Sequence, residues 1–102
     1  MGRGMSKSGF FYIMASRKNG TLYAGVTNNI IRRTMEHKEG KGSAFTAEHK
    51  VHKLVYYETY DCVIDAIVRE KRVKEWKRDW KIELIQSMNP DWRDLYEDVV
   101  KG

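Results

Sequence analysis

Hydrophobic residues dominate two short segments near the start of the chain. Residues 9–16 (GFFYIMAS) and 21–26 (TLYAGV) are rich in aromatic and β-branched side chains, which favours two β-strands. Between these segments, the pair Asn19-Gly20 is the strongest short signal of a tight β-hairpin, because both residues tolerate a positive φ. The sequence therefore predicts an antiparallel hairpin at the start of the fold.

After the hairpin the apolar residues change to helical spacing. The helical pattern begins at residue 30 and ends at Gly40, and Asn28 or Asn29 supplies its N-cap. The rest of the chain predicts a polar loop over 39–50, a third strand over 53–60, a long helix from Cys62 to about Arg78 capped by Asp61, and a short helix over 80–88. This order, β-β-α-β-α-(α), indicates an α+β fold with a small three-stranded antiparallel sheet flanked by helices.

The length of 102 residues suits one domain with one modest core, expected over residues 9–96. Residues 1–8 are expected to be a disordered start or an expression remnant, and residues 97–102 a C-terminal tail. No apolar stretch follows the basic N-terminal residues or is long enough to cross a bilayer, so neither a signal peptide nor a membrane span is predicted. The single cysteine, Cys62, cannot form an internal disulfide, which fits a reducing, cytoplasmic setting.

The net charge of +5 is distributed unevenly along the chain. Residues 17–53 hold eight Lys and Arg against three acids, residues 69–81 hold seven against three, and the segment from Ile82 onward holds two against five. Two basic blocks are typical of a surface that binds an anion, with phosphate the leading candidate. A basic surface that contacts only solvent explains the charge equally well. The charge alone therefore does not distinguish an anion-binding surface from a solvated one.

Two aromatic triplets in the predicted hairpin resemble the motifs of the GIY-YIG nuclease superfamily. The first is Phe10-Phe11-Tyr12 and the second is Tyr23-Ala24-Gly25, so both tyrosines and the glycine of the family pattern are present. Arg33 and His37 follow at the spacing of the family's first helix, and Glu70 resembles the acidic position of its second. The similarity spans roughly residues 9–96, and the C-terminal part looks like the small stand-alone bacterial members of this superfamily.

The resemblance implies an endonuclease that hydrolyses phosphodiester bonds in nucleic acid, DNA more than RNA, in repair or processing. It implies one divalent metal ion, Mg²⁺ or Mn²⁺, bound by Glu70 with water and phosphate oxygens completing the shell. The catalytic residues it implies are Tyr12, Tyr23, Arg33, His37 and Glu70. The residues expected to contact nucleic acid are Arg32, Lys38, Lys71, Lys74 and Asn89, of which Asn89 is the candidate for the family's late asparagine. Because the module is small, a protein partner that supplies targeting is also expected.

The residues themselves allow this chemistry and also simpler explanations. Tyr12 and Tyr23 lie on neighbouring strands, so their hydroxyls can converge, although a phenol with a pKa of about 10 needs a nearby cation to act as a base. Arg33 and His37 are four residues apart and share one helical face, which suits phosphate binding. The alternatives are ordinary packing for the tyrosines and an exposed polar face for the helix.

Glu70 is the least expected residue in its surroundings. Its helical neighbours include Ala66, Ile67 and Val73, and a carboxylate in an apolar stripe is unfavourable unless it is paired or binds a cation. The alternative to a metal is a salt bridge to Lys74 or Arg69.

Two other groups of residues are not assigned to the site. His49 and His52 have no third ligand at fixed spacing, so they do not predict a metal site. The tryptophans at 76, 80 and 92 can stack on bases, but packing of a C-terminal helix on the core is the more common use. Two other functions stay open at this point: a nucleic-acid-binding module without catalysis, and a protein-interaction scaffold.

Overall fold

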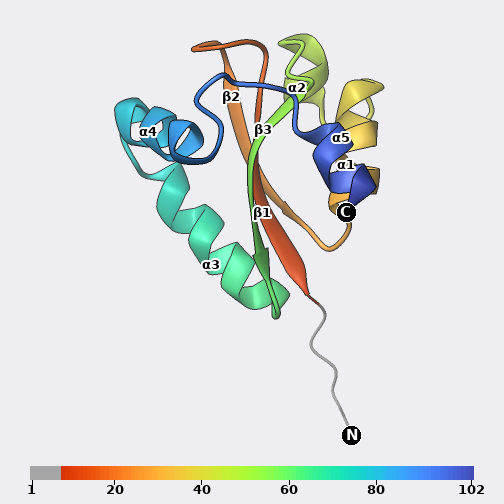
Figure 1. Ribbon diagram of the computed structural model, residues 1–102, viewed down its shortest axis with the longest axis vertical. Coiled ribbons are helices and arrows are strands. Elements are labelled where there is room, and N and C mark those ends of the chain that lie inside the picture. Colours follow the sequence, from red (N-terminus) through yellow and green to blue (C-terminus); the bar gives the residue numbers. More distant parts are fainter. Residues whose placement is uncertain (1–7) are drawn as a thin grey trace, which may run out of the picture.

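A computed structural model describes residues 8–102 of the chain, so the expectation for residues 1–8 lies, apart from Ser8, outside the described residues. The elements in order are β1 (Gly9–Ala15), β2 (Leu22–Thr27), α1 (Ile30–Lys38), α2 (Ala44–Glu48), β3 (Lys53–Tyr60), α3 (Val63–Lys74), α4 (Arg78–Met88) and α5 (Tyr96–Lys101). This arrangement confirms the predicted α+β class, with one three-stranded sheet between helices (Figure 1). Within residues 8–102, no helix is long and apolar enough to span a membrane.

The sheet has the order β2-β1-β3 with both pairs antiparallel, so β1 is the central strand. Tyr12 in the middle of β1 pairs with Gly25 on one side and with Tyr57 on the other. The predicted hairpin joins β1 to β2, and Asn19 in its turn has the positive φ, 59°, that the sequence indicated. Strand β2 is therefore an edge of the sheet, directly beside Tyr12.

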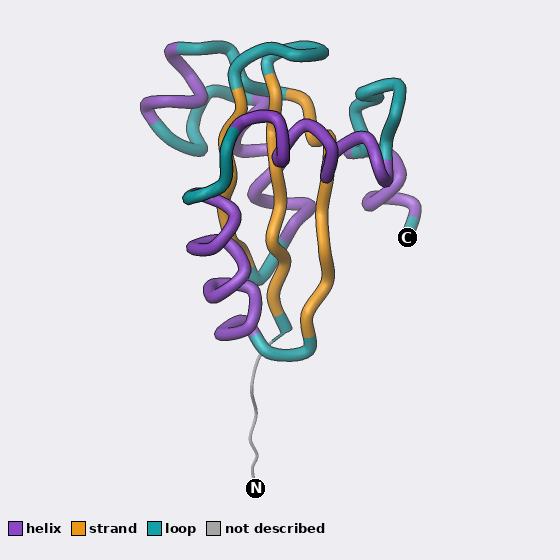
Figure 2. Tube along the Cα trace, turned by 90° about the vertical axis from the view of Figure 1, so that its left-hand side faces the viewer, coloured by secondary structure: helices purple, strands orange, loops and turns teal. Residues whose placement is uncertain are grey.

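Helices cover both faces of the sheet, as two views at right angles show (Figures 1 and 2). On the face covered by α3 and α4, the core contains Phe11, Ile13, Val55, Val73 and Ile85. On the face covered by α1 and α5, it contains Tyr12, Met14, Ile30, Leu54 and Leu95. Because successive strand residues point to opposite faces, β1 is buried on both sides, which explains its almost continuous run of apolar residues.

The helices differ from the predicted pattern in four places. The N-cap of α3 is Cys62, which makes no side-chain capping hydrogen bond, and not the expected Asp61. The segment expected to be a loop over 39–50 contains α2, whose N-cap Ser43 accepts a hydrogen bond from the Thr46 backbone N–H at 3.1 Å. The long helix expected to reach Arg78 ends at Lys74, because Lys77 has an extended backbone (φ −62°, ψ 152°) and a new helix, α4, begins after it. Most of the expected tail over 97–102 is helical and belongs to α5, which packs against α1.

Candidate active site

The side chain of Tyr12 crosses from the central strand toward β2, where Gly25 makes room for it. A Cβ atom at position 25 would lie 2.6 Å from the Tyr12 hydroxyl and 2.8 Å from the ring carbon that bears it, closer than real contacts. Only glycine permits this approach of side chain to backbone. The presence of glycine at position 25 in the second triplet is therefore explained by the space that the Tyr12 side chain needs, which the sequence motif alone does not show.

Tyr12 forms a buried hydrogen bond with His37 on α1. The Tyr12 hydroxyl lies 2.9 Å from His37 Nε2, and the two residues are 1% and 2% exposed. On the other side of the ring, His37 Nδ1 lies 3.0 Å from the hydroxyl of Thr46 on α2. Gly42 leaves space for this ring, because a Cβ there would lie 2.1 Å from Nδ1. Three elements, β1, α1 and α2, thus meet in one hydrogen-bonded chain.

The direction of the protons in this chain follows from its far end. The Thr46 hydroxyl lies 3.2 Å from the Ser43 carbonyl and 2.9 Å from the Ser43 hydroxyl, and when its single proton goes to either oxygen it accepts from His37 Nδ1–H. His37 then carries its proton on Nδ1, and Nε2 accepts the hydrogen bond from the Tyr12 hydroxyl. This assignment makes His37 a base that faces Tyr12.

Burial sets the charge state of both partners. Burial, with a further contribution from the charge of Arg33, lowers the pKa of His37 below its usual 6.5, so the imidazole is neutral at pH 7. Burial also raises the pKa of the Tyr12 phenol well above 10. Tyr23 raises this pKa further, the positive charge of Arg33 lowers it, and the charges of Glu70 and Glu36 raise it by smaller amounts. Tyr12 is therefore a protonated donor to a neutral base at rest.

Tyr23 lies beside this pair and faces a cleft along β2. Its ring is 5.2 Å from the His37 ring and 6.4 Å from the Tyr12 ring, and within residues 8–102 its hydroxyl has no hydrogen-bond partner. The cleft has a volume of about 390 Å³ and is lined by Ile13, Leu22, Tyr23, Ala24, Phe45, Lys74 and Lys81. Half-buried Tyr23 thus lines the same space as two lysines.

Arg33 is held beside the same group by two acceptors. Its Nη1 lies 3.2 Å from a Glu36 carboxylate oxygen and 3.4 Å from the Gly42 carbonyl. The side chain is 38% exposed, so its remaining N–H groups are available to a ligand. A guanidinium in this position suits an anion such as phosphate.

Glu70 projects from α3 and pairs with Lys74 at 2.7 Å, the salt bridge that the sequence left as an alternative. Its side chain is 18% exposed, and its charge is close enough to contribute to the raised pKa of Tyr12. The other proposed partner, Arg69, instead binds Glu58 at 3.0 Å. Residues 8–102 contain no group of three or more His, Cys, Asp or Glu side chains that could hold a metal ion. Glu70 thus belongs to no cluster of three metal-binding side chains among these residues, and its counterion Lys74 is half-exposed.

The other residues predicted to contact nucleic acid lie in different surroundings. Lys74 lines the cleft, and Arg32 and Lys71 are exposed, with Arg32 near Glu36 at 3.9 Å. Lys38 lies at the junction with α5, where it pairs with Asp94 and donates to the His52 carbonyl at 3.1 Å. The structure therefore places Lys74, and not Lys38, beside the cleft.

Asn89 requires a correction, because the structure gives it a structural position in place of the expected surface. It is 3% exposed, and its amide donates to the Val55 carbonyl at 3.2 Å and to the Arg93 carbonyl at 2.8 Å, while its oxygen accepts from the Arg93 N–H at 3.0 Å. These bonds hold the turn in which Trp92, fully buried, adopts a φ of 57°. Asn89 is fully occupied inside the protein.

We expect Asn89→Ala to lower the free energy of unfolding by about 2–3 kcal/mol, because three hydrogen bonds are lost and buried partners stay unsatisfied. Urea unfolding measures the change, with Gln86→Ala on the exposed side of α4 as the control. Unchanged stability combined with weaker binding to nucleic acid would instead restore the original assignment.

Three residues of the site were not found from the sequence. Thr46, Ser43 and Gly42 complete the environment of His37, yet they lie in a segment that was expected to be a loop. A signal existed, because Ser43 is a residue type that commonly caps the start of a helix. Polar composition and two nearby glycines concealed it.

The chain has relatives among known proteins. Residues 8–83 match the family model described as the GIY-YIG catalytic domain. The chain is 31% identical over 97 residues to a UPF0213 protein of Bacillus pumilus, covering 95% of this chain and 99% of that protein. It is 38% identical over 88 residues to a UPF0213 protein of Syntrophus aciditrophicus, covering 85% and 98%. The solution NMR structure of the UPF0213 protein BH0048 from Bacillus halodurans superimposes with a TM-score of 0.53 at 26% identity, covering 85% of this chain and 92% of that one. These matches confirm the resemblance and the fold class.

Proposed function

Because the chain belongs to the GIY-YIG catalytic domain family, we propose that it is a metal-dependent endonuclease that hydrolyses phosphodiester bonds in nucleic acid, DNA more than RNA, in repair or processing. The observation that carries this proposal is the hydrogen-bonded chain from Tyr12 through His37 to Thr46. This hydrogen bond points a neutral base at the tyrosine hydroxyl, which supports a role in proton transfer. Beside a cationic cleft, it suits activation of a water molecule.

The proposed reaction begins with the water that attacks phosphorus. Tyr12 takes a proton from this water as its own proton moves to His37 Nε2, 2.9 Å away. The hydroxide oxygen forms the new bond to phosphorus, the bond to the leaving oxygen breaks, and the leaving oxygen takes a proton from solvent, to which His37 later releases the proton that it received. Until this release, His37 is an imidazolium whose Nδ1–H remains hydrogen-bonded to Thr46, which keeps the ring in place throughout.

The remaining side chains bind the phosphate. Arg33 stabilises the negative charge that grows on the phosphoryl oxygens, because its guanidinium stays charged and is already oriented by Glu36 and Gly42. Tyr23 donates its unpaired hydroxyl to a phosphate oxygen in the cleft. Lys74, which is 51% exposed, exchanges its contact with Glu70 for a neighbouring phosphate.

The residues present fit the divalent ion that the family implies. Glu70 offers a carboxylate that is held only by an exposed lysine, and a hard cation such as Mg²⁺ is suited to one carboxylate together with water and phosphate oxygens. When bound, Mg²⁺ or Mn²⁺ supplies positive charge that stabilises the developing negative charge on the phosphate. With a single protein ligand, binding of the metal is expected to depend on the substrate.

The pH dependence of cleavage follows from the required charge of His37. The imidazole must be neutral to accept a proton and its pKa is lowered, so the rate is expected to rise with pH, with a midpoint below 6.5, and to level off by pH 7. Single-turnover rates between about pH 5 and pH 9 measure the profile. His37→Gln is expected to remove the acidic limb. A wild-type rate that keeps rising through pH 8 would contradict the role of His37.

The experiment that tests the function is a cleavage assay on a panel of labelled substrates. Duplex, single-stranded, nicked and branched DNA and RNA are each incubated with and without Mg²⁺ or Mn²⁺, and EDTA is added to stop the reaction. Metal-dependent cleavage that EDTA stops is the expected result. Binding that weakens steeply with salt, without cleavage of any substrate, would favour a nucleic-acid-binding module instead.

A further inference from the structure

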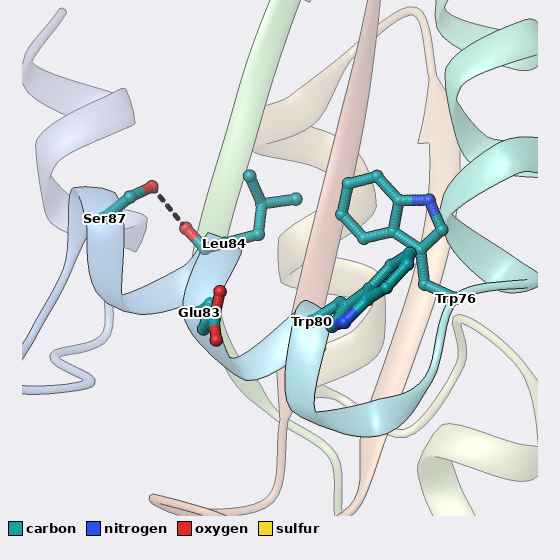
Figure 3. A pocket seen from close by; sticks show the side chains of 5 residues that line it. All are labelled: Trp76, Trp80, Glu83, Leu84 and Ser87. Carbon is teal, nitrogen blue, oxygen red and sulfur yellow. Dashed lines mark hydrogen bonds between the residues drawn. The ribbon is translucent and has the colours of Figure 1, made fainter.

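A second hollow lies at the corner between α3 and α4, and the proposed reaction does not use it (Figure 3). Its volume is about 370 Å³, and it is lined by Trp76, Trp80, Glu83, Leu84 and Ser87. Trp76 belongs to the turn after α3, and the other four belong to α4. None of the five lines the catalytic cleft.

The two tryptophans of this pocket have different roles. Trp76 is half-buried, packs against the core and carries the Arg69 guanidinium 5.1 Å from its ring centre. Trp80 leaves 54% of its surface exposed. The two rings meet edge to face at 6.0 Å and 74°, so Trp76 fixes the orientation of Trp80 while most of the Trp80 indole stays open. An oriented, open indole beside a hollow is a surface on which a nucleobase stacks.

Glu83 supplies the polar group that a bound base can use. Among the described residues 8–102, its carboxylate has no ion-pair partner within 4.0 Å, and it lies beside Trp80 in the pocket (Figure 3). The Ser87 hydroxyl, in contrast, already donates to the Leu84 carbonyl at 2.6 Å. A carboxylate accepts a hydrogen bond from an exocyclic amine such as cytosine N4, which thymine lacks.

Lysines connect this pocket to the catalytic cleft. Lys81, the residue after Trp80, and Lys74 both line the cleft, and Lys81 Nζ donates to the Lys74 carbonyl at 3.4 Å. The whole segment 69–81 carries seven Lys and Arg against three acids. This charge matches a polyanionic strand that leaves the cleft and passes the corner between α3 and α4.

We propose that the pocket binds one unpaired nucleobase, stacked on Trp80, with Glu83 accepting a hydrogen bond from its exocyclic amine. Lys74 and Lys81 contact the phosphates between this base and the cleavage site. The inference rests on the proposed function in taking the ligand to be nucleic acid. A base inside a duplex cannot enter the pocket, so the preferred substrate has an unpaired nucleotide, best one whose base carries an exocyclic amine, beside the bond that is cut.

Equilibrium binding without metal tests the pocket. A labelled single-stranded deoxycytidine oligonucleotide is titrated in EDTA, and binding is followed by fluorescence anisotropy. Trp80→Ala is expected to weaken binding by about 5- to 100-fold, the range that loss of one stacked base gives. Trp80→Tyr, which keeps an aromatic ring, is expected to stay close to the wild type. Met88→Ala, an exposed apolar residue of the same helix outside the pocket, is the matched control.

Two further arms identify the bound group as a base with an amine. Wild-type protein is expected to bind deoxycytidine more tightly than thymidine oligonucleotides, and Glu83→Gln is expected to remove this preference. An oligonucleotide without bases is expected to bind wild type and Trp80→Ala equally. Removing the bases and removing the Trp80 indole both abolish the same stacking contact, so the second change has no further effect. The first comparison uses unmodified protein, so it stands even if a variant fails to fold.

Equal affinity of wild type and Trp80→Ala for the deoxycytidine oligonucleotide, or the same loss for a blunt duplex, would overturn the proposal. The proposed function fails separately. If binding depends on Trp80 but no metal-dependent cleavage is found, the proposed nuclease function fails and the pocket proposal stands. If the protein cleaves with metal but its binding does not depend on Trp80, the pocket proposal fails and the nuclease function stands.

Discussion

Glu70→Ala is expected to lower metal-dependent cleavage by about 1,000-fold or more while the protein stays folded. A bound metal supplies several kcal/mol of transition-state stabilisation. Each loss of about 1.4 kcal/mol lowers the rate tenfold. Glu70 is the only carboxylate proposed to hold the ion, and residues 8–102 contain no cluster of three or more metal-binding side chains that could take over its role. The single-turnover rate at saturating Mg²⁺ is the quantity to compare.

The fold should tolerate this change. The Glu70–Lys74 contact is an i, i+4 pair with an exposed lysine, which contributes about 0–1 kcal/mol to stability. The neighbouring residues Ala66 and Val73 are fully buried, so a smaller apolar side chain suits the same stripe. Glu75→Ala removes an exposed acid just beyond α3 and serves as the matched control. Loss of activity together with loss of the folded circular dichroism spectrum would count against a role in metal binding.

Tyr12→Phe is expected to lower the cleavage rate by about 100- to 10,000-fold, the range that removal of a positioned acid–base group gives. The ring stays and keeps its packing beside Gly25, while the hydroxyl that connects the water to His37 is lost. Because the change leaves His37 Nε2 without its partner in a buried place, stability is expected to fall by about 1–3 kcal/mol. Binding of substrate should change little.

Two variants control for this result. Tyr57→Phe alters the tyrosine that pairs with Tyr12 across the sheet, and its hydroxyl takes no part in the proposed reaction, so it should retain full activity. Tyr23→Phe removes a phosphate contact and should cost less than Tyr12→Phe. If Tyr23→Phe abolished cleavage while Tyr12→Phe had little effect, the two tyrosines would exchange their roles.

The sheet, and the placement of several proposed catalytic residues on it and on its helices, follow from local sequence pattern, whereas their proposed roles came from the family resemblance. The Asn-Gly turn fixes the hairpin, and strand alternation then determines which residues of β1 reach each face. Helical spacing puts Arg33 and His37 on one side of α1, and it marked Glu70 as a carboxylate in an apolar stripe. These are short-range relations, which a sequence states directly.

The parts that sequence did not predict depend on contacts between distant segments. Thr46 reaches His37 only because α2 folds back over α1, and Gly42 is needed only because the imidazole lies against it. Asn89 was expected at the surface, yet it closes a turn against β3. Each case requires knowledge of which segments meet.

The tryptophans show the same limit. Trp92 is fully buried, as the packing interpretation predicted, whereas Trp80 is more than half exposed. The difference arises where α3 ends at Lys74 and α4 begins at Arg78. A continuous helix through this region would give Trp80 a different direction, so the break between the helices creates the pocket in Figure 3.

Single-turnover cleavage by wild type, Glu70→Ala and Tyr12→Phe, purified side by side and assayed with Mg²⁺ and with EDTA, tests the central claim most directly. Wild type is expected to cut only with the metal, and both variants are expected to lose this activity while they remain folded. Equal cleavage by all three proteins would contradict it, because the activity would then come from outside the group formed by Tyr12, His37 and Glu70.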